Sequence, residues 1–160
     1  MRRVEDRAMT LKIFDLIGIV LLTLVGGLYW GPWLALSRSL ATFEPEVFLA
    51  IVKRMNRNMG PLMTILMPVA LLSTLPVLLL SYSKRPATFD LTLIALVLFI
   101  ITLLVTLLVE VPIVQQIETW TVSTLPDNWQ QLRDRWGAFH ILRIVPAIAG
   151  LVLLLVGAIF

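Results

Sequence analysis

The chain contains no cysteine, which excludes disulfide bonds, thiolate zinc sites and iron–sulfur clusters. It contains one histidine, so any metal site would depend on scattered carboxylates gathered around a single imidazole. Charge is also scarce: 14% of the 160 residues are Asp, Glu, Lys or Arg, whereas soluble domains average about 25%. These shortages argue against a soluble globular enzyme and against an ordinary metalloprotein.

What the chain has instead is four long stretches without any charged residue. They cover residues 16–37, 58–83, 91–109 and 144–160. About 20 apolar helical residues cross the roughly 30 Å hydrocarbon core of a bilayer. The sequence therefore predicts an all-α integral membrane protein, a four-helix bundle in one transmembrane domain, residues 1–160. The expected spans are about 16–36, 61–81, 91–113 and 139–159.

Four basic residues precede the first span, as in a secretory signal peptide: Arg2, Arg3, Arg7 and Lys12. A signal peptide has an apolar region of only about 7–15 residues, and no small-residue cleavage pattern follows this longer stretch. We therefore expect an uncleaved first span. Four spans put both termini and the 2–3 turn on one side of the membrane, side A. The 1–2 and 3–4 connections share the other side, side B.

The two sides carry similar numbers of positive charges, six Lys and Arg on side A and seven on side B. The positive-inside rule is therefore nearly balanced, and the first span usually dominates the orientation. We expect a bacterial plasma membrane with both termini in the cytoplasm. All five tryptophans fall near side B: Trp30, Trp33, Trp120, Trp129 and Trp136. Side B is thus where we expect the chemistry.

The connection before span 2 has the pattern of an amphipathic helix that lies in the membrane interface, with apolar residues such as Phe48 opposite Lys53 and Arg57. We expect Gly60-Pro61 to separate this helix from span 2. In the first span, Gly26-Gly27 should allow a neighbouring helix to approach closely. The connection between spans 3 and 4 is expected to be extended.

One face of the last helix gathers residues suited to binding a ligand. They follow one another at spacings of 4, 3, 4 and 3, which stack side chains in one row: Trp129, Arg133, Trp136, His140 and Arg143. Guanidinium groups can hold an anionic or planar ligand, aromatic rings can wall it, and a histidine can carry a proton near neutral pH. Alternatively, the row is an interfacial Trp and Arg belt in which a backbone carbonyl satisfies His140.

Glu110 follows nineteen uncharged residues and is expected to be buried within the bundle. A charge at mid-span costs about 2.5–3.5 kcal/mol on insertion scales, so a partner is expected. Spans 3 and 4 are antiparallel neighbours, which brings Arg143 and His140 to a comparable depth. Two arrangements follow: an ion pair of Glu110 with Arg143, or an acid–base or metal pair with His140.

Four methionines recur every four residues before and within span 2: Met55, Met59, Met63 and Met67. Thioethers and a histidine can bind heme iron or Cu(I), but a helix break at Gly60-Pro61 would separate the four. Flexible core packing is the better interpretation. We predict no cofactor, while a heme or metal bound through His140 stays open. Asn56 is either a helix cap or an interfacial donor that reaches the side-B mouth.

Several short motifs, in this order and spacing, resemble those of a known family. They are Leu28-Tyr29-Trp30-Gly31-Pro32, Phe43-Glu44-Pro45, Met55-Asn56-Arg57-Asn58, Val111-Pro112 and Asp127-Asn128-Trp129, followed by Arg133-Asp134-Arg135-Trp136, His140 and Arg143. The family is the small four-span family of unknown function that includes the fungal anthrone oxygenases. The chain departs from the family's common Asn-x-Pro-x-Asn motif, because no asparagine flanks Pro112.

The resemblance implies a cofactor-independent oxygenase, in which a base deprotonates an aromatic substrate and the carbanion reduces O₂. It implies His140 as the base, oriented by Glu110, with Arg143 stabilising the anion. Arg133 would assist Arg143, and the substrate site would be completed by Trp129, Trp136, Asn56 and Trp30.

Non-enzymatic alternatives remain: a bundle that binds lipid or a small molecule, or an accessory subunit that docks a membrane partner through side B. A small transporter is a weaker interpretation, because only Glu110 and Arg143 could place charge within the membrane. We expect the lipid bilayer and a small lipophilic aromatic molecule as partners, and no nucleic acid. A homo-oligomer stays open.

Overall fold

The computed structural model describes residues 2–160, with the side chains of all but residues 2–5, 7 and 37. The side chains of Arg2, Arg3 and Arg7, on which the expected orientation partly depends, lie outside the described ones. Every regular element in residues 2–160 is helical, so the predicted all-α fold class is confirmed.

Four long helical rods make up the molecule. They are α1 (Arg2–Ala35), α2 (Pro45–Ser81), α3 (Pro86–Val105) with its continuation, and α5 (Trp129–Ile159). The third rod passes from α3 through a π-helical turn, η2 (Thr106–Glu110), into α4 (Val111–Thr119). Two short 3-10 turns, η1 (Ser37–Thr42) and η3 (Val122–Thr124), lie in the connections. All four rods are long and apolar enough to cross a membrane, as an integral membrane protein requires.

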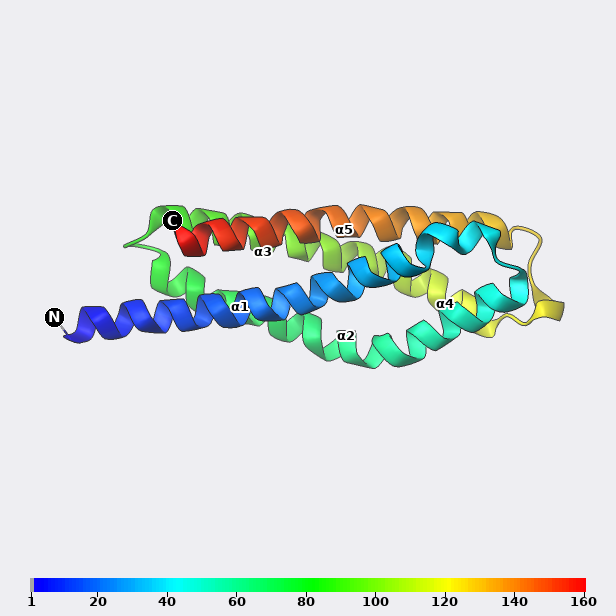
Figure 1. Ribbon diagram of the computed structural model, residues 1–160, viewed down its shortest axis with the longest axis horizontal. Helices are drawn as coiled ribbons and strands as arrows, with labels where there is room; N and C mark the ends of the chain where they lie inside the picture. The colour runs from blue at the N-terminus through cyan, green and yellow to red at the C-terminus, as the bar shows by residue number, and fades with distance from the viewer. Residues whose placement is uncertain (1) are drawn as a thin grey trace.

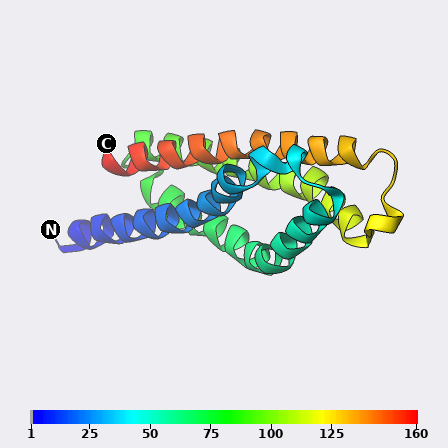
Figure 2. The same ribbon diagram turned by 45° about the vertical axis from the view of Figure 1, so that its right-hand side comes forward.

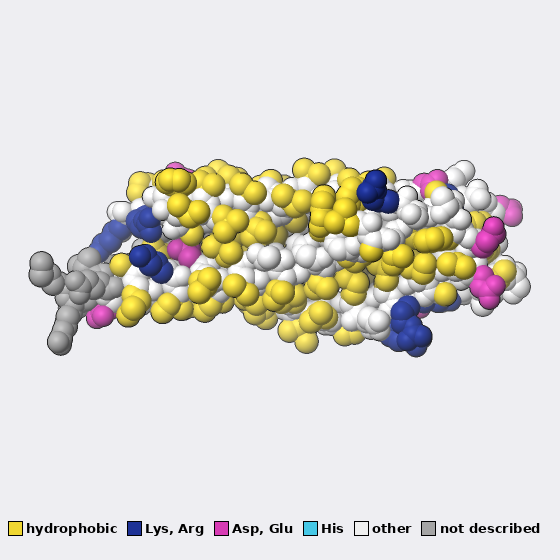
Figure 3. Space-filling view, in the orientation of Figure 1, with side chains coloured by type: hydrophobic (Ala, Val, Ile, Leu, Met, Phe, Trp, Pro, Cys, Tyr) yellow, Lys and Arg dark blue, Asp and Glu magenta, His cyan; other side chains and the backbone are white. Residues whose placement is uncertain are grey.

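Both chain termini lie at one end of the molecule, together with the turn between α2 and α3 (Figure 1). The other two connections lie at the opposite end, which is side B as defined from the sequence. Hydrophobic side chains cover the middle of the face seen in Figure 3, and Asp and Glu side chains gather at the side-B end. This distribution is the one that a bilayer around the middle of the bundle favours.

The interior consists of two apolar clusters stacked along the bundle. The cluster toward side A joins α1, α2, α3 and α5 and includes Leu22, Phe99 and Ile144. The cluster toward side B joins α2, α4 and α5 and includes Phe48, Ile117 and Trp136. Glu110, His140 and Arg143 lie between the two clusters along η2 and α5.

Helix α2 is continuous across Gly60-Pro61, so the predicted break at this position was wrong. The amphipathic segment before span 2 is the first part of the same helix. Three prolines lie inside α2, Pro61, Pro68 and Pro76, and each removes one backbone hydrogen bond and bends the helix. Apolar helices in a bilayer tolerate such prolines because leaving the helix would expose more unpaired backbone. As a result α2 bows away from the other rods before it rejoins them (Figure 2).

Close helix contact occurs at Gly150 rather than at the predicted Gly26-Gly27. A Cβ added at Gly26 or Gly27 would meet no atom within 4 Å, so the prediction for this pair was wrong. A Cβ added at Gly150 would lie 2.9 Å from Phe99 Cε2 and 3.2 Å from the Ala95 carbonyl oxygen. Glycine therefore allows α5 to pack directly on the backbone of α3.

We expect Gly150→Ala to lower the free energy of unfolding by about 1–3 kcal/mol, the usual cost of overpacking a filled core. This exceeds the gain of up to about 1 kcal/mol that alanine brings to a helix. Gly27→Ala is the matched control and should be neutral or stabilising, because its new methyl group meets open space. Thermal unfolding of both variants in the same detergent measures the difference. Equal midpoints would contradict the close contact.

Candidate functional site

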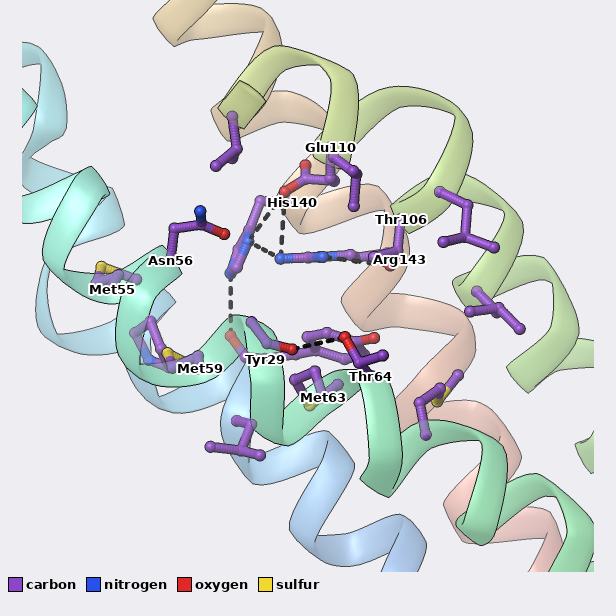
Figure 4. Close-up of a pocket in the computed structure, with 18 of the residues that line it drawn as sticks. Tyr29, Met55, Asn56, Met59, Met63, Thr64, Thr106, Glu110, His140 and Arg143 are labelled. Carbon is purple, nitrogen blue, oxygen red and sulfur yellow. Dashed lines mark hydrogen bonds and ion pairs between the residues drawn. The ribbon is translucent and has the colours of Figure 1, made fainter. Parts of the chain in front are cut away.

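A cavity of 540 Å³ lies between the bowed part of α2 and the rods formed by η2, α4 and α5 (Figure 4). Its volume is in the range of pockets that hold small organic ligands, about 300–1,000 Å³. Helix α1 contributes a further part of the lining through Leu28, Tyr29 and Pro32. The bow of α2 is therefore what creates the space for a ligand.

The α2 wall of this cavity carries all four methionines of the four-residue repeat: Met55, Met59, Met63 and Met67. The sequence did not predict that they would share a wall, because a break was expected at Gly60-Pro61. Since α2 stays helical through that point, side chains four residues apart remain on one face. Methionine is flexible and polarizable, so this wall can adapt to the outline of an apolar ligand.

Opposite the methionines, η2 and α5 bring a carboxylate, an imidazole and a guanidinium together. Arg143 Nη2 lies 3.2 Å from Glu110 Oε2 and 2.7 Å from His140 Nδ1. His140 Nδ1 lies 3.7 Å from the same Glu110 oxygen. The predicted ion pair between Glu110 and Arg143 is therefore confirmed, and His140 joins it. The three side chains are almost fully buried, at 3%, 8% and 2% exposure for Glu110, Arg143 and His140.

Both ring nitrogens of His140 are engaged. Nε2 lies 3.0 Å from the backbone carbonyl oxygen of Tyr29, which can only accept, so Nε2 is assigned the proton. Nδ1 then accepts a hydrogen bond from the Arg143 guanidinium, which can only donate. The expectation that a backbone carbonyl satisfies His140 is confirmed. These contacts leave the imidazole no free lone pair.

Arg143 is held by three neighbours besides Glu110 and His140. Its guanidinium carbon lies 4.4 Å from the centre of the Tyr29 ring, within the range of a cation–π contact. Its Nη1 donates to Thr106 Oγ1 at 3.2 Å, and its backbone carbonyl accepts from Thr102 Oγ1 at 3.2 Å. This enclosure fixes a positive charge at the edge of the cavity.

Tyr29 is a site residue that sequence reasoning missed. It positions His140 through its backbone carbonyl and Arg143 through the face of its ring. Its position in the Leu28–Pro32 motif was the one available clue. No side-chain pattern marks a residue that acts through its backbone, because every residue carries a carbonyl.

Several buried polar atoms near the cavity make no hydrogen bond in the described part of the chain. They are both carboxylate oxygens of Glu110, the Tyr29 hydroxyl, Trp136 Nε1 and Arg143 Nε. A buried polar group without a hydrogen bond costs about 1–3 kcal/mol, and such groups are rare outside functional sites. Glu110 also ends the π-helical turn η2, a distortion that is frequent at functional sites. This corner of the cavity can therefore accept a proton and donate hydrogen bonds to a ligand.

The predicted row on α5 faces the interior, where Arg133, Trp136, His140 and Arg143 are buried. Only its last three residues line the cavity. Trp129 is not in the lining; it packs against Phe48, with ring centres 5.6 Å apart, and its ring faces the Arg133 guanidinium.

Of three other predicted binding residues, Arg133 and Trp30 lie outside the cavity lining and Asn56 lies in it. Arg133 pairs with Asp134 at 2.9 Å and does not reach the cavity lining. Trp30 is 40% exposed, packs against Trp33 with the two rings tilted at 36°, and is also absent from the lining. Asn56 does line the cavity and donates a hydrogen bond to Glu118 Oε1 at 3.0 Å. The structure thus brings together Asn56 and the Trp136–Arg143 end of the row.

Within residues 2–160, no group of three or more His, Cys, Asp or Glu side chains is placed to hold a metal ion. A heme or metal bound through His140 would have to displace either the Tyr29 carbonyl or Arg143 from the ring. A cationic guanidinium next to Nδ1 also disfavours a metal cation there. The donor set around His140 is thus poorly suited to a metal.

A family model for anthrone oxygenase matches residues 48–153. The matched stretch contains the four-methionine wall, η2, α4 and the cavity-lining part of α5, with Glu110, His140 and Arg143 among its residues. No curated protein and no solved structure matches the chain. Because the family model covers more than half of its length, the chain belongs to the anthrone oxygenase family.

Proposed function

We propose that the protein is an oxygenase that oxidises a flat, lipophilic, anthrone-like molecule in the cavity between α2 and α5, without a bound cofactor. Family membership supports the reaction type, and the apolar wall of methionines supports a flat hydrophobic substrate. The observation that carries the proposal is Glu110, a buried carboxylate at the cavity edge whose two oxygens make no hydrogen bond.

The reaction needs only substrate and O₂. A base removes one proton from the ring CH₂ group that faces the carbonyl across the central ring, and the negative charge spreads onto the carbonyl oxygen. The carbanion gives its electrons to O₂, and a carbon–oxygen bond forms. Loss of the second proton from that carbon breaks the O–O bond, which leaves a quinone carbonyl and water. The substrate supplies all four electrons, so no further reductant or oxidant is required.

In this scheme Glu110 takes the proton. The sequence interpretation gave that role to His140 and made Glu110 its orienter, but the contacts favour the reverse assignment. Both imidazole nitrogens are engaged with Tyr29 and Arg143. In the Glu110 carboxylate, Oε2 forms the ion pair with Arg143, whereas Oε1 makes no hydrogen bond. His140 then acts as a positioning residue that holds Arg143.

Arg143 provides the positive charge that an enolate oxygen requires. Two buried donors without partners, the Tyr29 hydroxyl and Trp136 Nε1, belong to residues that line the same cavity. Hydrogen bonds from these two donors to the substrate oxygen would give the donors a partner and stabilise the negative charge on that oxygen. Arg133 lies outside the lining, and the proposal gives it no part in stabilising the anion.

The test is oxidation of anthrone by the purified protein in detergent or vesicles, followed by O₂ consumption and quinone absorbance. We expect one O₂ consumed per anthrone, one ¹⁸O atom from ¹⁸O₂ in the quinone, and an unchanged rate after treatment with a chelator. Heat-denatured protein corrects for the spontaneous oxidation of anthrone. Turnover no faster than this control would refute the proposal. Binding without turnover would favour the alternative, a ligand-binding bundle.

A further inference from the structure

The cavity opens on one side of the bundle, and each edge of this opening is a row of residues spaced four apart along a helix. On α2 its edge follows residues four apart, Asn56, Gly60, Thr64 and Pro68, all of which line the cavity. On η2 and α4 the facing edge follows Leu107, Val111 and Gln115, also four apart and also in the lining. Every residue of both edges is exposed on the outside of the bundle except Gly60, which is half-buried. Residues that line a cavity and are also exposed mark its opening, here called the slit.

The composition of the slit changes along its length. Thr64 donates its hydroxyl to the Gly60 carbonyl at 2.9 Å, so its methyl group remains for contact with apolar surroundings. Pro68, Leu107 and Val111 are apolar, and Leu107 is 53% exposed. Only the side-B end of the slit is polar, with Asn56 on the α2 edge and Gln115 on the α4 edge.

The apolar part of the slit lies within the depth of the hydrocarbon core. Thr64 comes seven residues after Arg57, the last charged residue before span 2, or about 10 Å along the helix. Leu107 comes eleven residues before Glu118, or about 16 Å along its rod. Thr64 and Leu107 are therefore farther from side B than Arg57 and Glu118, whose charges belong at the headgroups.

Two hydrogen bonds between α2 and the third rod close the end of the slit that is nearest the aqueous surface. Asn56 Nδ2 donates to Glu118 Oε1 at 3.0 Å. Figure 4 shows the Asn56 side chain on α2, near His140. One turn closer to the surface, Lys53 Nζ donates to the Trp120 carbonyl oxygen at 2.6 Å. One bond joins α2 to α4 and the other joins α2 to Trp120 at the C-terminal end of α4, both on the side-B side of the cavity.

We propose that the substrate reaches the cavity sideways, from the hydrocarbon core of the bilayer, through the slit between Thr64 and Leu107. A ring molecule dissolved among acyl chains then passes between two apolar edges and meets Glu110 without crossing the polar surface. Gly60 and Thr64 have small side chains, so the α2 edge leaves the slit open. The flexible methionine side chains behind it can adjust to a flat ring. The identity of the substrate rests on the proposed function, whereas the slit does not.

Because the chain has no cysteine, a single introduced thiol gives a single label. We would attach bimane to Met63→Cys, inside the cavity, in detergent and reconstitute the protein in phosphatidylcholine vesicles. Fluorescence in lipids with brominated acyl chains, relative to unbrominated lipids, reports access from the bilayer, and iodide reports access from water. Two additional backgrounds are compared: Thr64→Phe with Leu107→Phe at the slit, and Ile65→Phe with Leu108→Phe. Ile65 and Leu108 are exposed neighbours absent from the cavity lining.

We expect strong quenching of the label by brominated lipid and little by iodide. The slit pair of phenylalanines should remove most of the lipid quenching, and the neighbouring pair should leave it unchanged. Stronger quenching by iodide than by lipid, or no quenching at all, would overturn the proposal even if the slit variant fails to fold. Equal lipid quenching in the two phenylalanine backgrounds would also overturn it.

Unlabelled protein in vesicles of the same lipid separates the slit from the proposed reaction. With anthrone dissolved in the lipid, the slit variant should show a higher KM and a similar kcat, while the neighbouring variant matches the unmodified protein. Lipid quenching that behaves as expected, in a protein that fails to oxidise anthrone, would establish the slit and refute the oxygenase.

Discussion

Replacement of Glu110 by glutamine is expected to lower the rate of anthrone oxidation by about 100- to 10,000-fold, the usual contribution of a positioned general base. The amide keeps the size of the side chain, and its oxygen can take the place of the carboxylate oxygen that lies 3.2 Å from Arg143 Nη2. The substitution removes the ability to take up a proton while preserving most local contacts. Steady-state O₂ consumption, with circular dichroism to check the fold, measures the effect.

Two further variants make this result specific. Glu44→Gln changes an exposed glutamate at the start of α2 whose side chain makes no capping hydrogen bond, and it should leave the rate unchanged. His140→Gln should reduce the rate less than Glu110→Gln, because His140 acts by holding Arg143. If His140→Gln loses all activity and Glu110→Gln retains it, the base is the histidine and the assignment of Glu110 is wrong.

The parts of this site that the sequence predicted are those that follow from helix periodicity and from the cost of buried charge. The spacing of Trp136, His140 and Arg143 determines that they share one face of a helix, and that face is buried. Glu110 sits in an apolar stretch where an unpaired carboxylate is costly, so a cationic partner at matching depth could be expected.

Periodicity gives the face of a helix but not the place along it where a cavity ends. Trp129 and Arg133 belong to the same row as His140, yet their turns of α5 pack on Phe48 and pair with Asp134. Whether a residue of the row meets a ligand depends on the bow of the facing helix, α2. That bow arises from prolines that bend the helix without breaking it.

The same bow explains why the methionine wall and the slit could not be predicted. With a break at Gly60-Pro61, Met55 and Met67 would belong to separate helices, and no edge would continue from Asn56 to Pro68. Sequence pattern alone does not distinguish a proline that ends a helix from one that bends it, because the outcome depends on what surrounds the freed carbonyl. The family resemblance, by contrast, depends on residue identity and order, and it was confirmed.

Removal of Arg143, the positive partner of Glu110, should lower the free energy of unfolding more than any other single substitution considered. Arg143→Gln leaves the Glu110 carboxylate, 3% exposed, without its ion pair, and breaking a buried pair from one side costs about 3–5 kcal/mol. The double variant Glu110→Gln with Arg143→Gln should recover most of this loss, because neither charge then remains buried alone. Unfolding in mixed detergent micelles, followed by circular dichroism, gives the free energies for a double-mutant cycle.

Arg135→Gln is the control on the same helix, where an exposed guanidinium faces the Phe139 ring; it should change stability by no more than about 0.5 kcal/mol. Arg143 also donates to His140 and Thr106, so part of its loss is unrelated to charge and should persist in the double variant. The cycle isolates the remainder as the coupling to Glu110. A double variant no more stable than Arg143→Gln alone would contradict the buried ion pair between Glu110 and Arg143. Arg143 would then not be the partner that holds the Glu110 carboxylate at the cavity, as the proposed reaction requires.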